Sequence, residues 1–247
     1  MRETVFGLSA PNAGVRSCGM RSRRVEVVNR HVWSLSLGTL AAGSFVVLGV
    51  ALKRDHLDPF DSGLARAIAL LRGSIDGPMY WATRSGDFQP LLALGIALPL
   101  LLLLLRWRRE ARFVAACYAG GFVISIALKA LFRRARPPAA GGYLLPVPHS
   151  PSFPSSHAMG SACIIGALLV VLTVKLPRVW HAPVIVLGVG HVLAVAMSRV
   201  YFGVHYPSDV LGGCLASAAW VTAATGWFYP QLLPHESGKF AAVRVDR

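Results

Sequence analysis

Residues Leu91–Leu105 read LLALGIALPLLLLLL, a run without a charged or polar side chain. Such a run approaches the roughly 20 apolar residues that an α-helix needs to cross a bilayer. Residues Ile164–Val174, which read IIGALLVVLTV, form a second apolar run. Over all 247 residues, hydrophobic residues make up 54% and charged residues 15%, whereas a soluble domain usually carries about 25% charged residues. The composition therefore excludes a soluble protein and predicts a membrane protein.

Six segments have the length and apolar character of membrane-spanning helices. We therefore expect an all-α fold, a six-transmembrane-helix bundle formed by residues 31–230. Residues 1–30 are polar and rich in arginine, so we expect a disordered cytoplasmic tail there, and a second cytoplasmic tail at 231–247. The predicted spans are Ser34–Leu52, Gln89–Leu105, Phe113–Leu131, Ser156–Val174, Pro183–Val200 and Ser208–Phe228.

A further helix is predicted between the first and second spans. Its apolar residues recur at steps of three and four with charged residues between them, which is typical of an amphipathic helix too charged to span. We expect this interfacial helix to lie along the outer surface of the membrane, as a lid without a catalytic role. Its apolar positions are Leu57, Phe60, Leu64, Ile68, Leu71 and Ile75.

The formal net charge of +14 comes from basic residues that lie between the apolar runs. This distribution favours membrane lipids with anionic headgroups as partners and argues against nucleic acid. The cysteines have no CxxC spacing and fall mostly in apolar runs, so we expect neither a disulfide nor a zinc site. They are Cys18, Cys117, Cys163 and Cys214.

The placement of the arginines predicts how the spans are oriented, because cytoplasmic loops carry an excess of Lys and Arg. The basic segments before span one, between spans two and three, and between spans four and five are assigned to the cytoplasm, which places both termini there. The opposite, periplasmic or extracytoplasmic, face of the cell (inner) membrane then receives several cations against this bias. We interpret them as an anion-binding site: Lys129, Arg133, Arg134, Arg136 and Arg199.

The first polar segment on that face is KALFRRARP, from Lys129 to Pro137. Charged side chains within membrane segments are energetically unfavourable and mark functional sites. Lys129, Arg133 and Arg136 stand at i, i+4 and i+7, so they share one face if the helix of span three continues through them. From this spacing we expect Arg133 to bind a second phosphate, which would favour a diphosphate substrate. Arg134 is expected to contact lipid headgroups.

Two more polar segments border the spans on the same face. Residues Pro154–His157 read PSSH directly before span four, where Ser155 can cap the helix and free backbone amides can bind phosphate. The third segment joins Ser198-Arg199 to His205 and Asp209 at the start of span six. Spans three and five end on this face, and spans four and six begin there. We therefore expect the three segments to form one phosphate-binding cradle.

These segments resemble the three signature motifs of the type-2 phosphatidic acid phosphatase family, which also includes glucose-6-phosphatase and vanadium haloperoxidases. Lys129 with Arg136-Pro137 is similar to the first motif, Pro154–His157 to the second, and Ser198-Arg199 with His205 and Asp209 to the third. Three motifs in the right order are a strong signal. Ser156 stands where the family usually has glycine.

The resemblance implies a hydrolase that removes phosphate from a lipid phosphate or diphosphate, without a metal or other cofactor. It implies that His205 attacks phosphorus to form a phosphohistidine and that Asp209 orients His205. His157 would protonate the leaving oxygen and then activate water. The groups implied to hold the phosphate oxygens are the side chains of Lys129, Arg136, Arg199 and Ser155 and the amides of Ser156 and His157.

The sequence leaves other functions open. The same scaffold would suit a lipid phosphotransferase, which passes phosphate from histidine to another lipid, or a non-catalytic lipid-binding or transport protein. The pair of His205 and Asp209 argues against the non-catalytic alternative, which has no use for a nucleophile. Phosphatidic acid, phosphatidylglycerol phosphate, undecaprenyl diphosphate and a lipid A phosphate all remain candidate substrates, and the oligomeric state is equally open.

Overall fold

The computed structural model describes residues 36–138, 145 and 149–232. These residues form helices, turns and loops without a β-strand, so the predicted all-α fold is confirmed. The predicted tail at 1–30 lies outside the described residues, as does the tail at 231–247 apart from the end of the last helix. The described helices are Ser36–Lys53, α2 Asp58–Ala69, α3 Asp76–Ser85, α4 Phe88–Leu104, α5 Arg108–Phe132, α6 Ser156–Lys175, the short η1 Arg178–Trp180, α7 His181–Tyr201 and α8 Pro207–Leu232.

Five helical segments are long and apolar enough to cross a membrane: Ser36–Lys53, α5, α6, η1 with α7, and α8. Helices α3 and α4 pass the same test together, but they are bent by 51° at a short break, and as one broken span they bring the number to six. Five of the predicted spans match these segments to within five residues at each end, whereas the predicted span Gln89–Leu105 coincides with α4 alone and misses the α3 part of the broken pair. The chain is a multi-pass membrane protein. Helix α3 was not predicted, because its ten residues, DGPMYWATRS, are too few and too polar to stand out.

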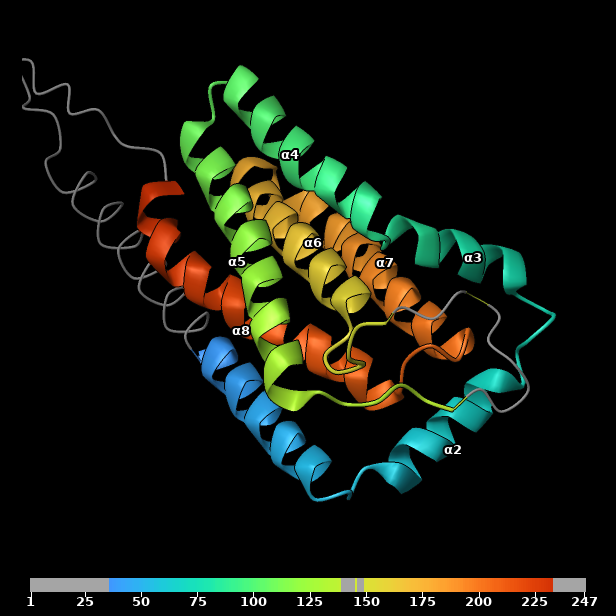
Figure 1. Cartoon of the computed structure of the whole chain (residues 1–247). Coiled ribbons are helices and arrows are strands. Elements are labelled where there is room, and N and C mark those ends of the chain that lie inside the picture. The colour runs from blue at the N-terminus through green and yellow to red at the C-terminus, as the bar shows by residue number, and fades with distance from the viewer. Residues whose placement is uncertain (1–35, 139–144, 146–148, 233–247) are drawn as a thin grey trace, which may run out of the picture.

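The bundle is organised around α6, which packs against α5, α7 and α8 (Figure 1). Phe113 and Cys117 of α5 and Met159 and Cys163 of α6 are buried in one apolar cluster. Small residues allow membrane helices to approach closely. Gly121 of α5 is such a residue, because an added Cβ would lie 2.4 Å from the Sγ of Cys163.

The ends of four helices meet at one end of the bundle, where α5 and α7 finish and α6 and α8 begin (Figure 1). This arrangement confirms that the three polar segments of the sequence lie together.

The opposite end holds the connections from α4 to α5 and from α6 to α7. There the Nζ atom of Lys175 lies 2.5 Å from Oε1 of Glu110 and 4.7 Å from the ring centre of Trp107.

Helix α2 lies across the polar end of the bundle, outside the spanning helices, and packs on α7 and α8 (Figure 1). It corresponds to the predicted amphipathic helix but is shorter, because the chain turns at Leu70 and starts α3 at Asp76. Phe60 and Leu64 of α2 remain 45% and 41% exposed, whereas Asp61 is only 2% exposed. The helix therefore turns a carboxylate, as well as apolar side chains, toward the bundle.

Candidate active site

His205 lies in the short loop that joins α7 to α8 and is only 3% exposed. The loop turns tightly at Gly203, whose φ of 73° is a conformation that glycine adopts without strain. The amides of Val204 and His205 then donate to the carbonyl of Arg199, at 3.2 and 3.3 Å. These bonds hold the imidazole directly over the end of α7, next to Arg199.

Asp209, in the first turn of α8, is fully buried and orients His205 from one turn away. Its Oδ2 lies 3.2 Å from Nδ1 of His205 and accepts a hydrogen bond of 2.9 Å from the amide of Tyr206. The hydroxyl of Ser152 also donates to this Oδ2 and lies 3.3 Å from Nδ1 of His205. Ser152, which reaches the site from the loop before α6, lies outside the three motifs and was not predicted.

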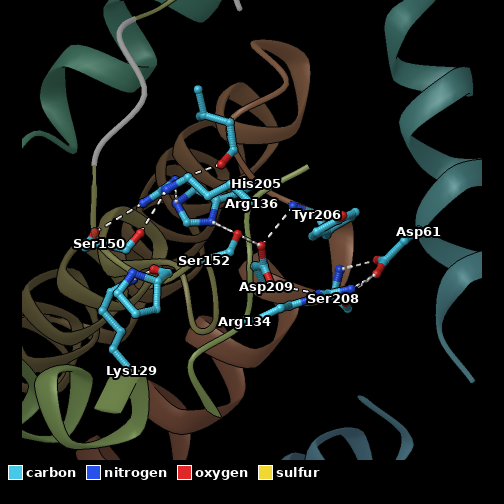
Figure 2. Close-up of polar contacts among 12 residues, drawn as sticks. Asp61, Lys129, Arg134, Arg136, Ser150, Ser152, His205, Tyr206, Ser208 and Asp209 are labelled. Carbon is cyan, nitrogen blue, oxygen red and sulfur yellow. Dashed lines mark hydrogen bonds and ion pairs between the residues drawn. The ribbon is translucent and has the colours of Figure 1, made fainter. Parts of the chain in front are cut away.

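The other ring nitrogen of His205, Nε2, lies 3.2 Å from Nη1 of Arg136 (Figure 2). A guanidinium can only donate, so Nε2 must be the nitrogen with the free lone pair, and Nδ1 carries the proton shared with Asp209. Burial is the main cause that lowers the pKa of His205 from 6.5 to about 3; the hydrogen bond and charge of Asp209 oppose this effect, and the positive charges of Arg136 and Arg199 add to it. His205 is therefore neutral, with its basic nitrogen among cations.

The cations of the site are held by backbone carbonyls and a hydroxyl. Nζ of Lys129 donates to the carbonyl of Pro151, and Arg136 donates to Ser150 O at 3.1 Å and to Val204 O at 2.7 Å (Figure 2). Arg199 is buried and donates through Nη1 to the hydroxyl of Thr83 in α3. Lys129 and Arg136, predicted from the first polar segment, and Arg199, predicted from the third, therefore lie around the same histidine.

His157, in the first turn of α6, is paired with Asp87, a residue that was not predicted. Its Nε2 lies 2.8 Å from Oδ1 of Asp87, at the break between α3 and α4. Gly86 allows this approach, because an added Cβ would lie 2.6 Å from Val195 and 3.4 Å from Cδ2 of His157. The other oxygen of Asp87 binds Arg84 at 2.8 Å. A single acidic residue before an apolar run is too common a feature to identify this partner.

Ser155 occupies the N-cap position of α6, as predicted, but the expectation that its side chain caps the helix is wrong. Its hydroxyl is buried without a hydrogen-bond partner among the described residues, as is Nε of Arg199. The amide of Ser155 instead donates to the carbonyl of Asp209 at 3.0 Å, which ties α6 to α8. Ser156 is exposed, and its hydroxyl lies 3.2 Å from that of Ser125 in α5.

The shared helical face predicted for Lys129, Arg133 and Arg136 is wrong, because α5 ends at Phe132. Arg133 adopts the left-handed conformation with φ 47°, which breaks the helical period, and its exposed side chain bonds to the carbonyl of Ala130. Arg133 therefore does not continue the helical face that carries Lys129. The headgroup contact expected for Arg134 is also wrong, since its guanidinium turns inward and lies 2.8 Å from Oδ1 of Asp209 (Figure 2).

A cavity of about 810 Å³ opens beside His205. It lies between α2 and the loop from α7 to α8, and its lining includes Arg66, Arg72, Pro137 and Gly203. Among the described residues there is no group of three or more His, Cys, Asp or Glu side chains that could hold a metal ion.

A membrane-spanning helical bundle with a buried His–Asp pair and three cations at one end defines an integral membrane enzyme that handles phosphate. Comparison with known protein families places it further: the model of the PAP2 superfamily matches residues 92–232, and the chain belongs to this superfamily. The matched region contains every site residue predicted from the motifs. Asp87 and α2 lie before it.

Similar proteins agree with this assignment. The chain is 29% identical over 174 residues to phosphatidylglycerophosphatase B of Bacillus subtilis, across 68% of this chain and 83% of the relative. It is 38% identical over 115 residues to decaprenylphosphoryl-5-phosphoribose phosphatase of Mycobacterium tuberculosis, across 45% and 58%. The crystal structure of a PAP2-type phosphatidylglycerolphosphate phosphatase from Bacillus subtilis shares the fold, with a TM-score of 0.71 at 24% identity, over 78% of this chain and 96% of that chain. The protein is a membrane lipid phosphatase of the PAP2 type, a hydrolase of phosphoester or diphosphate bonds.

Proposed function

We propose that this phosphatase cleaves a lipid phosphate or diphosphate at the extracytoplasmic face of the membrane, through a phosphohistidine on His205. The observation that carries the proposal is the state of His205. Its Nδ1 lies 3.2 Å from Asp209, and its Nε2 lies 3.2 Å from a guanidinium that cannot accept a proton. A buried, neutral imidazole with a fixed tautomer and a basic nitrogen among cations is suited to attack an electron-poor phosphorus atom.

In the first half of the reaction, Nε2 of His205 attacks phosphorus and an N–P bond forms. The bond from phosphorus to the lipid oxygen breaks, and that oxygen takes a proton from His157; the protonated lipid product leaves, and His157 becomes a neutral imidazole. His205 becomes cationic as it is phosphorylated, and the carboxylate of Asp209 stabilises this charge through Nδ1–H. Asp87, 2.8 Å from Nε2 of His157, supplies a matching carboxylate for the acid.

In the second half, water attacks the phosphohistidine. His157 takes a proton from the water as the new P–O bond forms, the N–P bond breaks, and inorganic phosphate leaves with His205 again neutral. The proton that His157 gave to the lipid oxygen is thereby restored, so the enzyme returns to its starting state. The overall reaction consumes one lipid phosphate and one water.

The non-reacting oxygens of the phosphoryl group need donors, because negative charge is spread over them during transfer. Arg136, Lys129 and Arg199 surround His205 and supply these charges. The Nε of Arg199 and the hydroxyl of Ser155 have no hydrogen-bond partner within the described part of the chain, and this supports the role, since buried polar atoms of a folded protein are normally hydrogen-bonded. The amides of Ser156 and His157 lie in the first turn of α6, where free N–H groups and the helix dipole favour an anion.

Two features support a lipid substrate. The cavity of about 810 Å³ beside His205 is large enough for a headgroup and opens at an end of the bundle that α2 borders. The named relatives act on phosphatidylglycerophosphate and on a decaprenylphosphoryl sugar phosphate, which both combine a phosphate with long apolar chains. The extracytoplasmic assignment rests on the arginine bias of the opposite end.

The test is phosphate release by purified protein in detergent, measured on a panel of lipid monophosphates and diphosphates. The unchanged protein should release phosphate from at least one lipid with EDTA present, and His205→Ala should lose at least about 10³-fold in kcat while keeping its thermal unfolding midpoint. Brief reaction with ³²P-labelled lipid and alkaline quenching should trap label on the protein, and His205→Ala should remain unlabelled. Activity that survives in His205→Ala would overturn the mechanism, and label found on an added lipid acceptor rather than in free phosphate would indicate a phosphotransferase.

A further inference from the structure

We propose that Asp61, on the interfacial helix α2, is a positioning residue for the reaction, and that it acts through Arg134 on the carboxylate of Asp209. The inference rests on the proposed role of the His205–Asp209 pair. Helix α2, which was predicted to be a lid without a catalytic role, would then be part of the active site.

The first step is the chain of contacts from α2 to Asp209 (Figure 2). Nη2 of Arg134 lies 2.7 Å from Oδ2 of Asp61, and Nη1 lies 2.8 Å from Oδ1 of Asp209. Ser208, next to Asp209 in the chain, completes the network: its amide donates to Oδ1 of Asp61 at 2.8 Å, and its hydroxyl donates to Oδ2 at 2.7 Å. Nη1 of Arg134 also donates to this hydroxyl at 2.7 Å.

The second step is that the two carboxylate oxygens of Asp209 bind different partners. Oδ1 is held by Arg134, while Oδ2 faces Nδ1 of His205 and accepts from the amide of Tyr206. A carboxylate bound on both oxygens cannot rotate about its χ2 torsion without breaking one set of bonds. Arg134 therefore fixes the oxygen that His205 uses, and the ring of Tyr206, 3.9 Å from the guanidinium carbon, holds Arg134 from one side.

The third step concerns charge. Asp61 is 2% exposed and Asp209 is fully buried, with one guanidinium between them. A buried carboxylate is unfavourable unless it is paired and hydrogen-bonded, and Asp61 has both an ion partner and the two donors of Ser208. Because Arg134 is shared, only part of its positive charge offsets Asp209. Without the charge of Asp61, the full positive charge of Arg134 would offset the negative charge of Asp209. Asp209 would then stabilise the cationic, phosphorylated His205 less well.

The proposal predicts an effect on turnover rather than on substrate binding. Asp61→Asn keeps the size of the side chain and one oxygen acceptor but removes the charge. We expect kcat to fall about 10-fold or more with KM changed less than about 3-fold, because Asp61 acts on the step in which His205 becomes charged. Asp55→Asn, an exposed carboxylate three residues before α2, is the matched control and should keep the kcat of the unchanged protein. Asp55 has φ 57°, which asparagine tolerates.

A double-mutant cycle separates positioning from a structural role. If Asp61 acts through Asp209, Asp61→Asn should lower kcat far less in an Asp209→Asn background than in the unchanged protein, because the carboxylate it orients is already gone. Equal fold losses in the two backgrounds would overturn the proposal, as would a kcat loss that disappears once activity is corrected for the fraction of folded protein.

A variant at Arg134 covers the case in which Asp61→Asn does not fold. Arg134→Lys keeps the positive charge but has no planar fork with which to bind both carboxylates at once, so the same fall in kcat and the same non-additivity with Asp209→Asn are expected. Unchanged kcat in Arg134→Lys would count against the inference. Activity in His205→Ala would instead show that the proposed function itself is wrong, so the two failures are distinguishable.

Discussion

The surroundings of His205 disfavour protonation of its imidazole, apart from the carboxylate of Asp209. Burial and the charges of Arg136 and Arg199 disfavour the imidazolium, and only Asp209 favours it. The result is an imidazole that stays neutral well below the pH at which a histidine in water becomes charged. Phosphorylation at Nε2 changes this balance, because the added phosphoryl group brings negative charge among the cations while Asp209 already faces the proton on Nδ1.

The depressed pKa of His205 predicts how stability depends on pH in the substrate-free protein. Below pH 6.5 the unfolded chain binds a proton at this histidine, whereas the folded protein does not until about pH 3. The free energy of unfolding should therefore fall as the pH is lowered through this window, by up to about 1.4 kcal/mol per pH unit from this residue. The measurement is the thermal unfolding midpoint in detergent between pH 7 and pH 5.

His205→Gln is the control for this prediction, since it removes the titrating group and keeps the size of the side chain. The midpoint of the variant should depend less steeply on pH than that of the unchanged protein. Identical pH dependence of the two proteins would show that His205 is not held neutral in the folded state.

At the scale of the helices, the contact between α6 and α8 sets the distance between the start of α6, which carries His157, and Asp209 at the start of α8. Gly213 of α8 faces the backbone of α6, and an added Cβ would lie 2.8 Å from the carbonyl oxygen of Ser155 and 3.2 Å from the amide of Met159. Ser217, one turn further along α8, donates to the carbonyl of Met159 at 2.9 Å. The two helices are therefore in backbone contact at the point where α6 begins.

Gly213→Ala should force this end of α6 away from α8, because the backbone atoms that the new methyl meets cannot rotate aside. We expect a loss of about 1–3 kcal/mol in stability, typical of overpacking, together with a lower kcat, since the start of α6 also carries His157. Gly166→Ala is the matched control in the same interface: its Cβ would lie 3.5 Å from Val221, an ordinary contact. Thermal unfolding and kcat measured on both variants test the contact, and equal behaviour of the two would contradict it.

At the scale of the whole molecule, every polar segment of the site lies at one end of the bundle and the arginine-rich connections lie at the other (Figure 1). A substrate anchored in one leaflet can reach His205 only from the leaflet at that end. Which leaflet this is decides the pool of lipids that the enzyme meets, and the positive-inside bias predicts the outer one.

Cysteine labelling tests this orientation. In a Cys18→Ser background, His149→Cys marks the end with the site and Val179→Cys marks the other end, and both positions are exposed. A maleimide that cannot cross membranes should label His149→Cys in intact cells and Val179→Cys only after permeabilisation. The reverse pattern would place the active site at the cytoplasmic face and contradict the proposed substrate pool.

The sequence by itself determined the spans and the meeting of the three motifs. Apolar runs near the length of the bilayer become helices because lipid offers no partner for an unpaired backbone. Consecutive spans alternate in direction, so the ends of α5 and α7 and the starts of α6 and α8 must lie on one face. Lys129, Arg136, His157, Arg199, His205 and Asp209 could be predicted in this way, with help from the family resemblance.

Only the tertiary structure decided which side chains complete the site. Arg134 and Asp61 are 73 residues apart in the chain, His157 and Asp87 are 70 apart, and Ser152 and Asp209 are 57 apart. Helical periodicity relates residues three or four apart, so it carries no information about such pairs. The period also failed where the helix stopped: once α5 ends at Phe132, the left-handed Arg133 turns outward and Arg134 turns inward toward Asp61 and Asp209. The packing of α2 and α3 against the bundle, rather than any local pattern, brought these partners to the histidines.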